Sequence, residues 1–367
     1  LYHDMGLSMI GFPTVYGGHS TLMSPTAFIR RPQRWIQALS DESRHAQVVT
    51  AAPNLAYEWA VQRGRPEPDQ PIDLSNVVMI IGSEPVSMDA ITMFNKAFAP
   101  FGLPATAIKP SYGIAEATLM VATTAPTAEA TLVHFDRAEL SVGRAVRVDA
   151  ASPGAVGQVS CGQLARSLRG VIVDPDTHRE LPDGRVGEIW LHGNNVGRGY
   201  WGRPEETRAT FDAVLSARLD RGSHAGDVAA SAHWLRTGDL GAYCEGELFV
   251  TGRLVEMIVV DGRNHYPHDV EGTVAEAAPL VRRGYAVAFT VPDAAASERL
   301  VIVAERARGT GRTDPQPAIE AIGTAVARTH GLTVGDVRFL SAGSIPRTTS
   351  GKLARRACRA RYLDGTL

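Results

Sequence analysis

The sequence predicts an α/β chain in two parts: a large part of mixed sheets and helices over residues 1–252, and a small α+β part over residues 253–367. Three observations predict this division. Val77–Ile81 is a short β-branched run that ends in a glycine-containing loop, as buried strands of open α/β sheets do. Residues 234–263 contain two strand patterns around the turn Glu245-Gly246, which predicts a hairpin. After that hairpin, short strand and helix patterns alternate to the end of the chain.

The composition is typical of a globular chain with a sizeable core. Its 367 residues are 44% apolar and 21% charged, which suits two domains. A net charge of −2 and an isoelectric point near 6.6 give no support to a nucleic-acid partner. The cysteines are odd in number and lack metal-ligand spacing, so we expect a cytoplasmic protein. No apolar run approaches the roughly 20 residues that span a bilayer, so we expect no transmembrane segment.

The large part reads as helices and strands separated by proline and glycine. Trp35, Ile36 and Leu39 recur at helical spacing, and Pro53-Asn54 is a good start signal for a second helix. The expected helices cover residues 32–43, 55–63, 87–98 and 204–219, and the expected strands cover residues 77–81, 106–109, 170–173 and 186–193.

Two strand ends of the large part could hold a nucleotide. Gly82-Ser83-Glu84-Pro85 follows one strand, and Ser111-Tyr112-Gly113-Ile114-Ala115-Glu116 follows the next as a polar turn. Tyr112 could stack on a base, and Glu116 could hold Mg²⁺ through oxygen coordination. Taken alone, these residues favour a plainer interpretation, in which Tyr112 is a capping aromatic and Glu116 an acid at a helix N-terminus.

The hairpin brings two further candidates together. Arg236-Thr237-Gly238-Asp239 and Thr251-Gly252-Arg253 flank its turn. Asp239 could accept hydrogen bonds from a ribose diol, and Arg253 could contact ribose or phosphate. The alternative is two ordinary turns in a β-rich region. We interpret residues 253–257 as a hinge to a small lid.

The lid sequence predicts a compact α+β unit. Its expected strands cover residues 257–260, 285–291, 300–305 and 336–340, and its expected helices cover residues 268–278, 317–329 and the stretch from 353. The loop before the last helix ends in Ser350-Gly351-Lys352 but lacks a Walker pattern, because Pro346 and Leu353 stand where that motif needs Gly and Ser or Thr. Lys352 could still donate a charge to a phosphate; the alternative is a solvated surface lysine.

Taken in order, these motifs resemble the adenylate-forming superfamily of acyl-CoA synthetases, luciferases and peptide-synthetase adenylation domains. The matching stretches are Tyr2-His3-Asp4-Met5-Gly6-Leu7, Gly82-Ser83-Glu84-Pro85, Tyr112-Gly113-Ile114-Ala115-Glu116, Gly187-Glu188-Ile189-Trp190, Arg236-Thr237-Gly238-Asp239, Thr251-Gly252-Arg253 and Pro346-Arg347-Thr348-Thr349-Ser350-Gly351-Lys352. The resemblance implies the C-terminal portion of the large adenylate-forming domain plus the lid. The chain starts at Leu1 within a motif, and the family's phosphate loop lies upstream of that motif, so we expect part of a longer protein.

Within the superfamily the sequence is similar to fatty-acyl-AMP ligases. Pro32-Gln33-Arg34-Trp35, Ala52-Pro53-Asn54-Leu55-Ala56-Tyr57 and Val159-Ser160-Cys161-Gly162 match that subfamily. The 46 positions from Glu116 to Gly162 leave room for its typical insertion, near residues 128–150. Asp261-Gly262-Arg263-Asn264-His265-Tyr266-Pro267 and the C-terminal tail resemble mycobacterial ligases that load long acyl chains onto the polyketide synthase of mycolic acid condensation.

The resemblance implies specific roles for the candidate residues. It implies ATP and Mg²⁺ as cofactors, a long-chain fatty acid as substrate, and an acyl carrier protein domain of a polyketide synthase as partner. The implied roles are nucleotide binding for Gly82, Ser83, Glu84, Pro85, Ser111, Tyr112 and Gly113; Mg²⁺ ligation for Glu116; ribose binding for Asp239 with support from Arg253; charge donation for Lys352; and a place near the acyl–phosphate junction for His3. The alternatives are a long-chain acyl-CoA ligase, or a catalytically incompetent chain that binds acyl-AMP.

Two features depart from the general pattern of the superfamily: the phosphate loop expected upstream is missing from this sequence, and the hinge differs. The hinge usually carries Lys-Asp, where this chain has Val255-Glu256. The insertion is also longer than a simple loop requires, so we expect it to pack on the large domain and restrain the lid against the arrangement that accepts CoA. Five of its apolar residues could bury an edge for that purpose: Val133, Phe135, Leu140, Val142 and Val146. The alternative is a passive surface loop.

Overall fold

The computed structural model describes residues 3–292, 298–348 and 351–367. Tyr2, Thr349 and Ser350, which belong to two of the motifs, lie outside these residues. The chain forms two compact units. The first comprises residues 1–135, 147–150 and 155–250; the second comprises residues 136–146, 151–154 and 251–367. The predicted division into domains 1–252 and 253–367, with a hinge between them, remains a proposal about movement.

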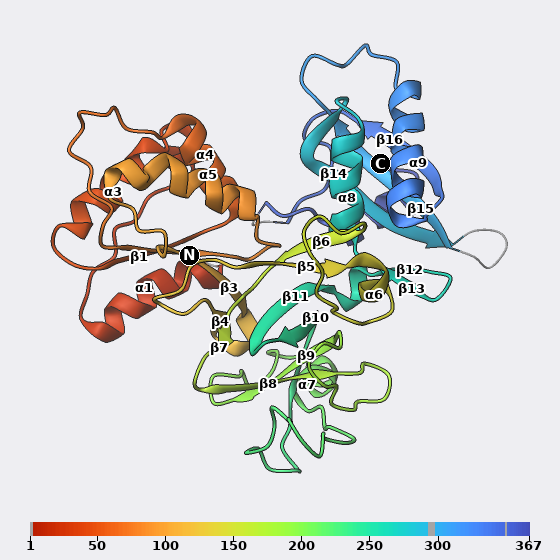
Figure 1. The fold of residues 1–367 in the computed structure, drawn as a ribbon, viewed down its shortest axis with the longest axis horizontal. Coiled ribbons are helices and arrows are strands. Elements are labelled where there is room, and N and C mark those ends of the chain that lie inside the picture. The colour runs from red at the N-terminus through yellow and green to blue at the C-terminus, as the bar shows by residue number, and fades with distance from the viewer. Residues whose placement is uncertain (1–2, 293–297, 349–350) are drawn as a thin grey trace. The chain divides into compact units, whose positions relative to one another are not determined.

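The first unit contains most of the helices and strands (Figure 1). Its helices are α1 (Asp4–Tyr16), α2 (Pro25–Arg30), α3 (Gln33–Ser43), α4 (Asn54–Arg63), α5 (Met88–Phe98) and α7 (Pro204–Phe211), with 3₁₀ turns η1 (Ala99–Phe101) and η2 (Ala115–Ala117). Its strands are β1 (Val48–Ala52), β2 (Val77–Ile81), β3 (Ile108–Ile114), β4 (Leu119–Thr123), β5 (Leu132–Asp136), β6 (Ala155–Val159), β7 (Gln163–Leu164), β8 (Leu168–Val173), β9 (Gly187–Gly193), β10 (Leu235–Cys244) and β11 (Glu247–Arg253), the ends of β5 and β11 reaching the second unit.

A five-stranded sheet in the order β1-β2-β3-β4-β7 carries the first candidate residues. Strands β1, β2 and β3 are parallel, and β4 and β7 continue the sheet antiparallel. The predicted buried strand is therefore confirmed as β2, in the parallel half. Helices α3, α4 and α5 lie together on one side of this sheet and α1 lies on the other (Figure 1). Trp35, Tyr57 and Phe94 pack against one another in the core beneath α3–α5, with Tyr57 edge to face against both of the others.

The predicted hairpin is confirmed as β10 and β11, which join β9 and β8 in a four-stranded sheet. Its turn residues Glu245 and Gly246 have φ values of 53° and 80°. Two consecutive positive φ values define the tight turn whose twist matches that of a hairpin.

Three expectations about the first unit are wrong. Strand β3 does not end at residue 109, because Ser111 and Tyr112 are buried and continue the ladder opposite Thr123 and Ala122. The polar turn expected after that strand is therefore strand up to Ile114. The helix expected over residues 204–219 ends at Phe211, and Ala213 in the segment that follows forms a β-bridge with Trp234. Strand β1 is an element that the sequence patterns do not predict.

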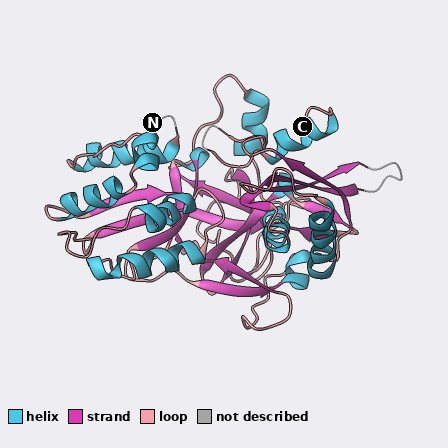
Figure 2. Cartoon of the chain, turned by 90° about the horizontal axis from the view of Figure 1, so that it is seen from above, coloured by secondary structure: helices cyan, strands magenta, loops and turns pink. Residues whose placement is uncertain are grey.

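The second unit confirms the predicted α+β class (Figure 2). It contains α6 (Arg137–Ser141), η3 (Leu254–Glu256), β12 (Ile258–Val260), β13 (Arg263–His265), α8 (Pro267–Ala277), β14 (Val281–Pro292), β15 (Glu298–Arg306), α9 (Gln316–His330), β16 (Val334–Leu340) and α10 (Arg355–Leu363). Strand β15 pairs antiparallel with β14 and parallel with β16. Helices α8 and α10 pack against β14, and α9 packs against α8 and β16. The core between them is rich in Val, Ile and Ala.

The insertion is shared between the two units. Strand β5 pairs with β6, and Phe135 lies edge-on against Phe249 with ring centroids 5.2 Å apart. Residues 136–146, which include α6, cluster instead with the second unit. The expectation that the insertion packs on the large domain and restrains the lid stays a prediction. Val133, Phe135 and Leu140 are buried as expected, whereas Val142 and Val146 are 43% and 44% exposed.

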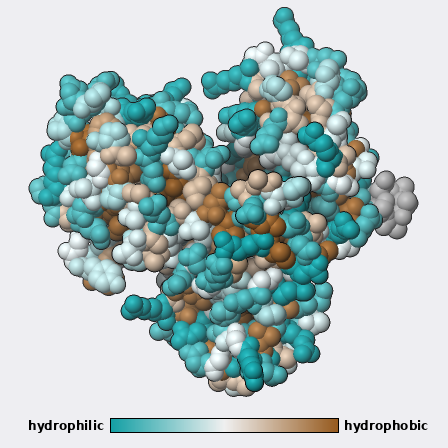
Figure 3. Space-filling view, viewed as in Figure 1, coloured by the Kyte–Doolittle hydropathy of each residue, from teal (hydrophilic) through white to brown (hydrophobic). Residues whose placement is uncertain are grey.

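The visible surface mixes hydrophilic and hydrophobic side chains (Figure 3). Helix α1 contributes exposed apolar residues, among them Leu7, Val15 and Tyr16. Within the described residues, no helix is both long enough and apolar enough to cross a membrane.

Candidate functional site

The loop after β2 is held rigidly by the start of α4. The Asn54 side chain donates from Nδ2 to the Pro85 carbonyl at 2.9 Å and accepts from the Ser87 amide at 3.0 Å. The Asn54 amide also donates to Oε1 of Glu84 at 2.9 Å. Sequence analysis used Asn54 only as a helix-start signal and missed this role. The Gly82–Pro85 loop is therefore preorganised by a residue 28 or more positions earlier in the chain.

Glycine is required where this loop meets β3. A Cβ atom on Gly82 would lie 2.4 Å from the Ser111 carbonyl oxygen, and one on Gly113 would lie 2.2 Å from the Leu119 carbonyl oxygen. Ser83, the residue after Gly82, has a φ of 69° in the left-handed region. Close backbone approach at two neighbouring positions, with a strained residue beside them, is a feature of functional sites.

Tyr112 and Asp239 join two motifs that lie 127 positions apart. The Tyr112 hydroxyl on β3 donates to Oδ2 of Asp239 on β10 at 2.7 Å. Both residues are at least nine-tenths buried, with exposed fractions of 9% and 6%. A carboxylate offers about four acceptor positions, so this bond is compatible with further donors such as ribose hydroxyls. Sequence analysis predicted both residues and the structure brings them together, although it did not anticipate their direct bond.

Tyr112 also lines a small cavity of about 40 Å³. Its lining includes Gly82, Ser83, Ser111, Tyr112 and Gly113, all predicted to bind a nucleotide. The remainder of the lining is mostly apolar and includes Met5, Met9, Phe12, Ala51, Ile80, Leu119 and Met120. This cavity is far smaller than the roughly 300 Å³ of an ordinary ligand site, so it marks where polar and apolar residues meet and is not a preformed pocket for a nucleotide.

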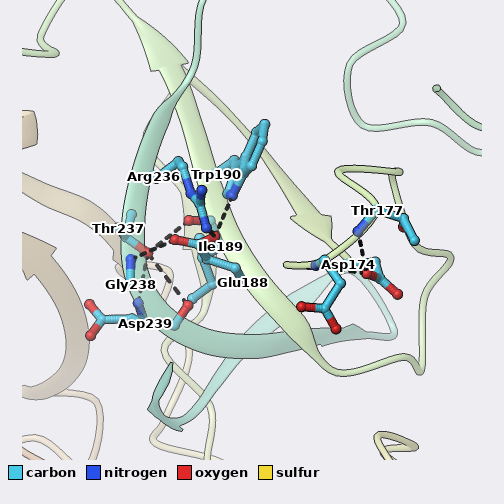
Figure 4. Close-up of polar contacts among 10 residues, drawn as sticks. Asp174, Thr177, Glu188, Ile189, Trp190, Arg236, Thr237, Gly238 and Asp239 are labelled. Carbon is cyan, nitrogen blue, oxygen red and sulfur yellow. Dashed lines mark hydrogen bonds and ion pairs between the residues drawn. The ribbon is translucent and has the colours of Figure 1, made fainter. Parts of the chain in front are cut away.

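Asp239 is positioned by a buried network centred on Glu188 (Figure 4). The Glu188 carboxylate, 2% exposed, accepts from Nε and Nη2 of Arg236 at 3.0 and 2.9 Å and from Nε1 of Trp190 at 2.8 Å. It also accepts from the Gly238 amide at 3.0 Å. The Asp239 amide donates to Oγ1 of Thr237 at 3.1 Å. Sequence analysis used Glu188 only as part of a motif, because most of its partners lie about fifty positions away.

Glu116, the predicted Mg²⁺ ligand, is half-buried in the turn η2. The Tyr200 hydroxyl donates to its Oε1 at 2.6 Å, and its own carbonyl accepts from the Gly197 amide at 2.7 Å. Burial, and then the Glu116 carboxylate, raise the pKa of Tyr200 to about 12, so that its hydroxyl remains a donor at neutral pH. Tyr200 is a second residue that sequence analysis missed, although it lies in a conspicuous glycine-rich stretch.

His3 stands at the start of α1, where its Nδ1 accepts from the Met5 amide at 3.3 Å. Nδ1 also lies 2.6 Å from Oδ1 of Asp4. This is a helix-capping arrangement, and the predicted role of His3 near the acyl–phosphate junction stays a prediction.

In the second unit, Lys352 is exposed and is hydrogen-bonded to Thr348. Its backbone carbonyl accepts from the Thr348 amide at 2.8 Å, and its amide donates to Oγ1 of Thr348 at 3.0 Å. Ala354 closes the base of the loop on Pro346 at 2.9 Å. Arg253 is the exposed last residue of β11 and belongs to the same unit. The roles predicted for Lys352 and Arg253 remain proposals.

Comparisons with known proteins identify the class to which this site belongs. Residues 1–201 match the AMP-binding enzyme family, and residues 255–367 match the AMP domain of Disco-interacting protein 2-like proteins. The chain therefore belongs to the AMP-binding enzymes, the adenylate-forming superfamily, as the motifs predicted.

Curated relatives of this chain include proteins named as fatty-acid–AMP ligases. It is 47% identical over 388 residues to the long-chain-fatty-acid–AMP ligase FadD32 of Mycolicibacterium smegmatis, a match that covers 100% of this chain and 61% of that protein. It is also 45% identical over 371 residues to the 4-hydroxyphenylalkanoate adenylyltransferase of Mycobacterium tuberculosis, covering 99% of this chain and 57% of that protein. The chain thus spans about three-fifths of the length of these relatives.

Solved structures of fatty acyl-adenylate ligases also match this chain. A structure from a study of fatty acyl-adenylate ligases of Escherichia coli and Legionella pneumophila matches with a TM-score of 0.80 and 28% identity, covering 99% of this chain and 61% of that one. The L. pneumophila fatty acyl-adenylate ligase in complex with acyl adenylate and pyrophosphate matches with a TM-score of 0.62 and 34% identity, covering 99% and 61%. The predicted resemblance and fold class are confirmed.

Proposed function

We propose that the chain belongs to an enzyme that activates a long-chain fatty acid with ATP, forming acyl-AMP and pyrophosphate. The observation that carries the proposal is the buried Tyr112–Asp239 bond of 2.7 Å, which joins two of the motifs. Around Tyr112, polar loop residues suit the nucleotide half of an acyl adenylate, and apolar residues of α1 suit its acyl half. The relatives named as fatty-acid–AMP ligases, and the Legionella ligase solved with acyl adenylate and pyrophosphate, support the same assignment.

Different residues contact different parts of the acyl adenylate. Asp239 accepts hydrogen bonds from the ribose hydroxyls, and Tyr112 both holds Asp239 and presents its ring to the base. The rigid Gly82–Pro85 loop faces the adenine. Met5, Met9 and Phe12 contact the hydrocarbon side, where methionine adapts to chains of different shape. The carboxylate of the substrate then attacks the α-phosphate of ATP and pyrophosphate leaves, so no protein nucleophile is required.

Charge is the main obstacle, because an anion must approach a polyanion. Glu116 fits Mg²⁺, an ion that is usually held by one or two carboxylates together with substrate phosphates. The described residues contain no group of three or more potential metal-ligating side chains, which is consistent with an ion that depends on the nucleotide. When bound, Mg²⁺ neutralises phosphate charge. Lys352 supplies a second positive charge when the lid closes, with support from Arg253 at the ribose and His3 near the acyl group.

The phosphopantetheine thiol of an acyl carrier protein domain of a polyketide synthase then attacks the acyl carbonyl, so that a thioester forms, AMP leaves and the thiol proton is released. This step rests on the resemblance to ligases with the same insertion. An acyl-CoA product is the alternative, and incubation of the acyl adenylate with either CoA or a loaded carrier domain separates the two by the thioester that forms.

The proposal is tested by binding and by exchange. A non-hydrolysable acyl-AMP mimic with a long alkyl chain should bind this chain in calorimetry, and ATP–pyrophosphate exchange should depend on added long-chain fatty acid. A chain that binds the mimic but shows no exchange is a binding chain and not a catalyst. No binding of the mimic overturns the proposal.

The relative named for 4-hydroxyphenylalkanoate makes the acyl half the feature to test next. Exchange should be measured with hexadecanoic acid and with a 4-hydroxyphenylalkanoic acid of similar length. The Met5, Met9 and Phe12 lining favours the hydrocarbon, because it offers no polar partner for a buried phenol hydroxyl. Faster exchange with the hydroxyphenyl acid would make that acid, and not the fatty acid, the proposed substrate.

A further inference from the structure

Helix α10 begins with an arginine that joins three elements of the second unit. Arg355 donates from Nε and Nη2 to the two carboxylate oxygens of Glu271 on α8, both at 2.7 Å. Its Nη1 donates to Oε2 of Glu256 in η3 at 2.8 Å. The three side chains are only 10–21% exposed. Shielded, two-pronged charge pairs of this kind hold geometry more firmly than surface pairs do.

The Glu256 end of this cluster lies in the segment predicted to be the hinge. None of the residues of η3 is buried, and Val255 is 59% exposed, so apolar packing holds this turn only weakly. The Arg355–Glu256 bond ties it to the body of the unit. Glu256 is one of the two residues that stand where the superfamily usually has Lys-Asp.

The Glu271 end is anchored independently of the hinge. Oε1 of Glu271 also accepts from the Ala288 amide on β14 at 3.1 Å. Loss of the Glu256 bond would therefore leave Arg355 held by α8. Arg355 thus has two partners: Glu271, which is anchored on α8 and β14, and Glu256, which lies in the predicted hinge.

Arg355 also stands at the base of the Lys352 loop. The loop closes at the Ala354–Pro346 hydrogen bond of 2.9 Å and at the bridge between Arg347 and Leu353. The Arg347 guanidinium lies 4.2 Å from the centre of the Tyr285 ring on β14, which fixes the other side of the base. Arg355 directly follows Ala354, the residue whose amide closes the base of the loop that carries Lys352.

We infer that Arg355 is a positioning residue that couples the hinge acid Glu256 to the placement of Lys352. A change at the hinge alters the hydrogen bond between Arg355 and Glu256. Through the base of the loop, it then alters the direction in which the Lys352 ammonium points. This inference rests on the proposed acyl-AMP ligase function for its catalytic consequence. The coupling itself is a property of the second unit.

The first test uses kinetics on the full-length enzyme. Arg355→Lys keeps the charge but loses the fork, so it should lower kcat for acyl-AMP formation about tenfold while leaving KM for ATP within about twofold. Arg356→Lys, on the exposed next position, is the matched control and should behave as wild type. A wild-type rate in a folded Arg355→Lys variant overturns the inference, as does a loss confined to KM.

The second test separates positioning from general stability. Glu256→Gln and Arg355→Met should each lower kcat, and the double variant Glu256→Gln/Arg355→Met should lose less than the product of these two single losses, because both changes break one connection. Glu276→Gln, an exposed acid on α8, is the control. Strictly multiplicative losses contradict the coupling.

A third measurement needs no catalysis. Trypsin cleavage after Lys352 should be about threefold or more faster in Glu256→Gln than in wild type or Glu276→Gln, because the loop base loses one support. Accelerated cleavage in a protein that makes no acyl-AMP would sustain the coupling and reject the proposed function. Unchanged cleavage in an active enzyme would reject the coupling and sustain the function.

Discussion

The Asp239 turn and the Lys352 loop present charge in opposite ways. Asp239 is 6% exposed and is held by Tyr112, while Thr237 and the Glu188 network fix its backbone. Lys352 is exposed on a loop whose own backbone bonds, and not burial, define its shape. The first arrangement suits a group that must bind in every state of the reaction. The second suits a charge that is needed in one step and removed before the next.

Lys352→Ala is the strongest test of this contrast between the buried Asp239 and the exposed Lys352. If the lysine stabilises mainly the transition state of adenylation, kcat should fall about 10²-fold or more, while affinity for an acyl-AMP mimic changes little. Rapid-quench measurement of acyl-AMP gives the rate, and calorimetry gives the affinity. Parallel losses in rate and affinity would make Lys352 an ordinary binding residue.

Asp239→Ala should have the complementary effect. Loss of charge-assisted bonds to the ribose hydroxyls should weaken binding of the mimic by about 1.5–3 kcal/mol. Binding is again read by calorimetry, with Asp227→Ala as a control, since that aspartate pairs with Arg169 and more than half of its side chain is exposed. Unchanged affinity in a folded Asp239→Ala variant would remove this residue from the site.

The same contrast explains which parts of the molecule were predictable from the sequence. Strand β2 and the β10–β11 hairpin were predictable, because β-branched runs and the Glu245-Gly246 turn act locally. Strand β3 was not predictable over Ser111–Gly113, because the strand partner that buries these residues lies in β4. The shorter α7 has a similar cause: Ala213 bridges to Trp234, and this distant pairing overrides local helical spacing.

The candidate site shows the same limit. Tyr112 and Asp239 were recognised from motif chemistry, but their bond spans 127 positions and has no local signature. Glu188, Tyr200 and Arg355 act by holding another functional residue or its loop. Residues of this kind are visible only when the tertiary partners are known, because an acid in a strand and an arginine on a helix have no special spacing of their own.

Removal of the helical part of the insertion tests whether the second unit is restrained. The Arg137 amide lies 3.1 Å from the Gly154 carbonyl, so a two- or three-residue Gly-Ser linker can replace residues 138–153 and keep strands β5 and β6. If the segment favours one lid arrangement by about 1–3 kcal/mol, its loss should raise acyl-CoA formation by about 5–150-fold, with acyl-AMP formation retained. The two products are separated by chromatography of the reaction mixture.

Arg137→Ala is the milder companion to that deletion. Its guanidinium lies 3.7 Å from Asp269 and 3.3 Å from Nδ1 of His330, which links α6 to α8 and α9. It should raise acyl-CoA formation in the same direction but by less. A deletion variant that folds, makes acyl-AMP and yields no acyl-CoA would show that the segment does not control product choice.

His330 makes the second unit sensitive to acid. Burial, and then the charge of Arg137, lower the pKa of His330 to about 4; Asp269 opposes this shift and His265 adds to it. Between this value and the ordinary value near 6.5, the unfolded state binds a proton that the folded state rejects. Stability should therefore fall as pH falls below 6.5, by about 2 kcal/mol at pH 5.

Urea unfolding at pH 7 and pH 5 measures this effect, and His330→Gln supplies the control. The variant keeps a side chain that can bond with Thr273, the partner of Nε2 at 2.8 Å, but it does not titrate. The loss of stability between the two pH values should be smaller in the variant than in wild type. Equal losses would assign the acid sensitivity to other groups.

The smallest expected effect lies in the first unit, at the Tyr112 hydroxyl. Tyr112→Phe keeps the buried ring beside the cavity but removes the donor to Asp239, so affinity for the acyl-AMP mimic should fall by only about 0.5–1.5 kcal/mol. In the presence of Asp239→Ala the same change should have almost no further effect, because its partner is already absent. A large loss in Tyr112→Phe, or full additivity in the double variant, would mean that the hydroxyl contacts the ligand itself. Tyr112 would then be a residue that binds the ligand directly, and not one that holds Asp239 in place.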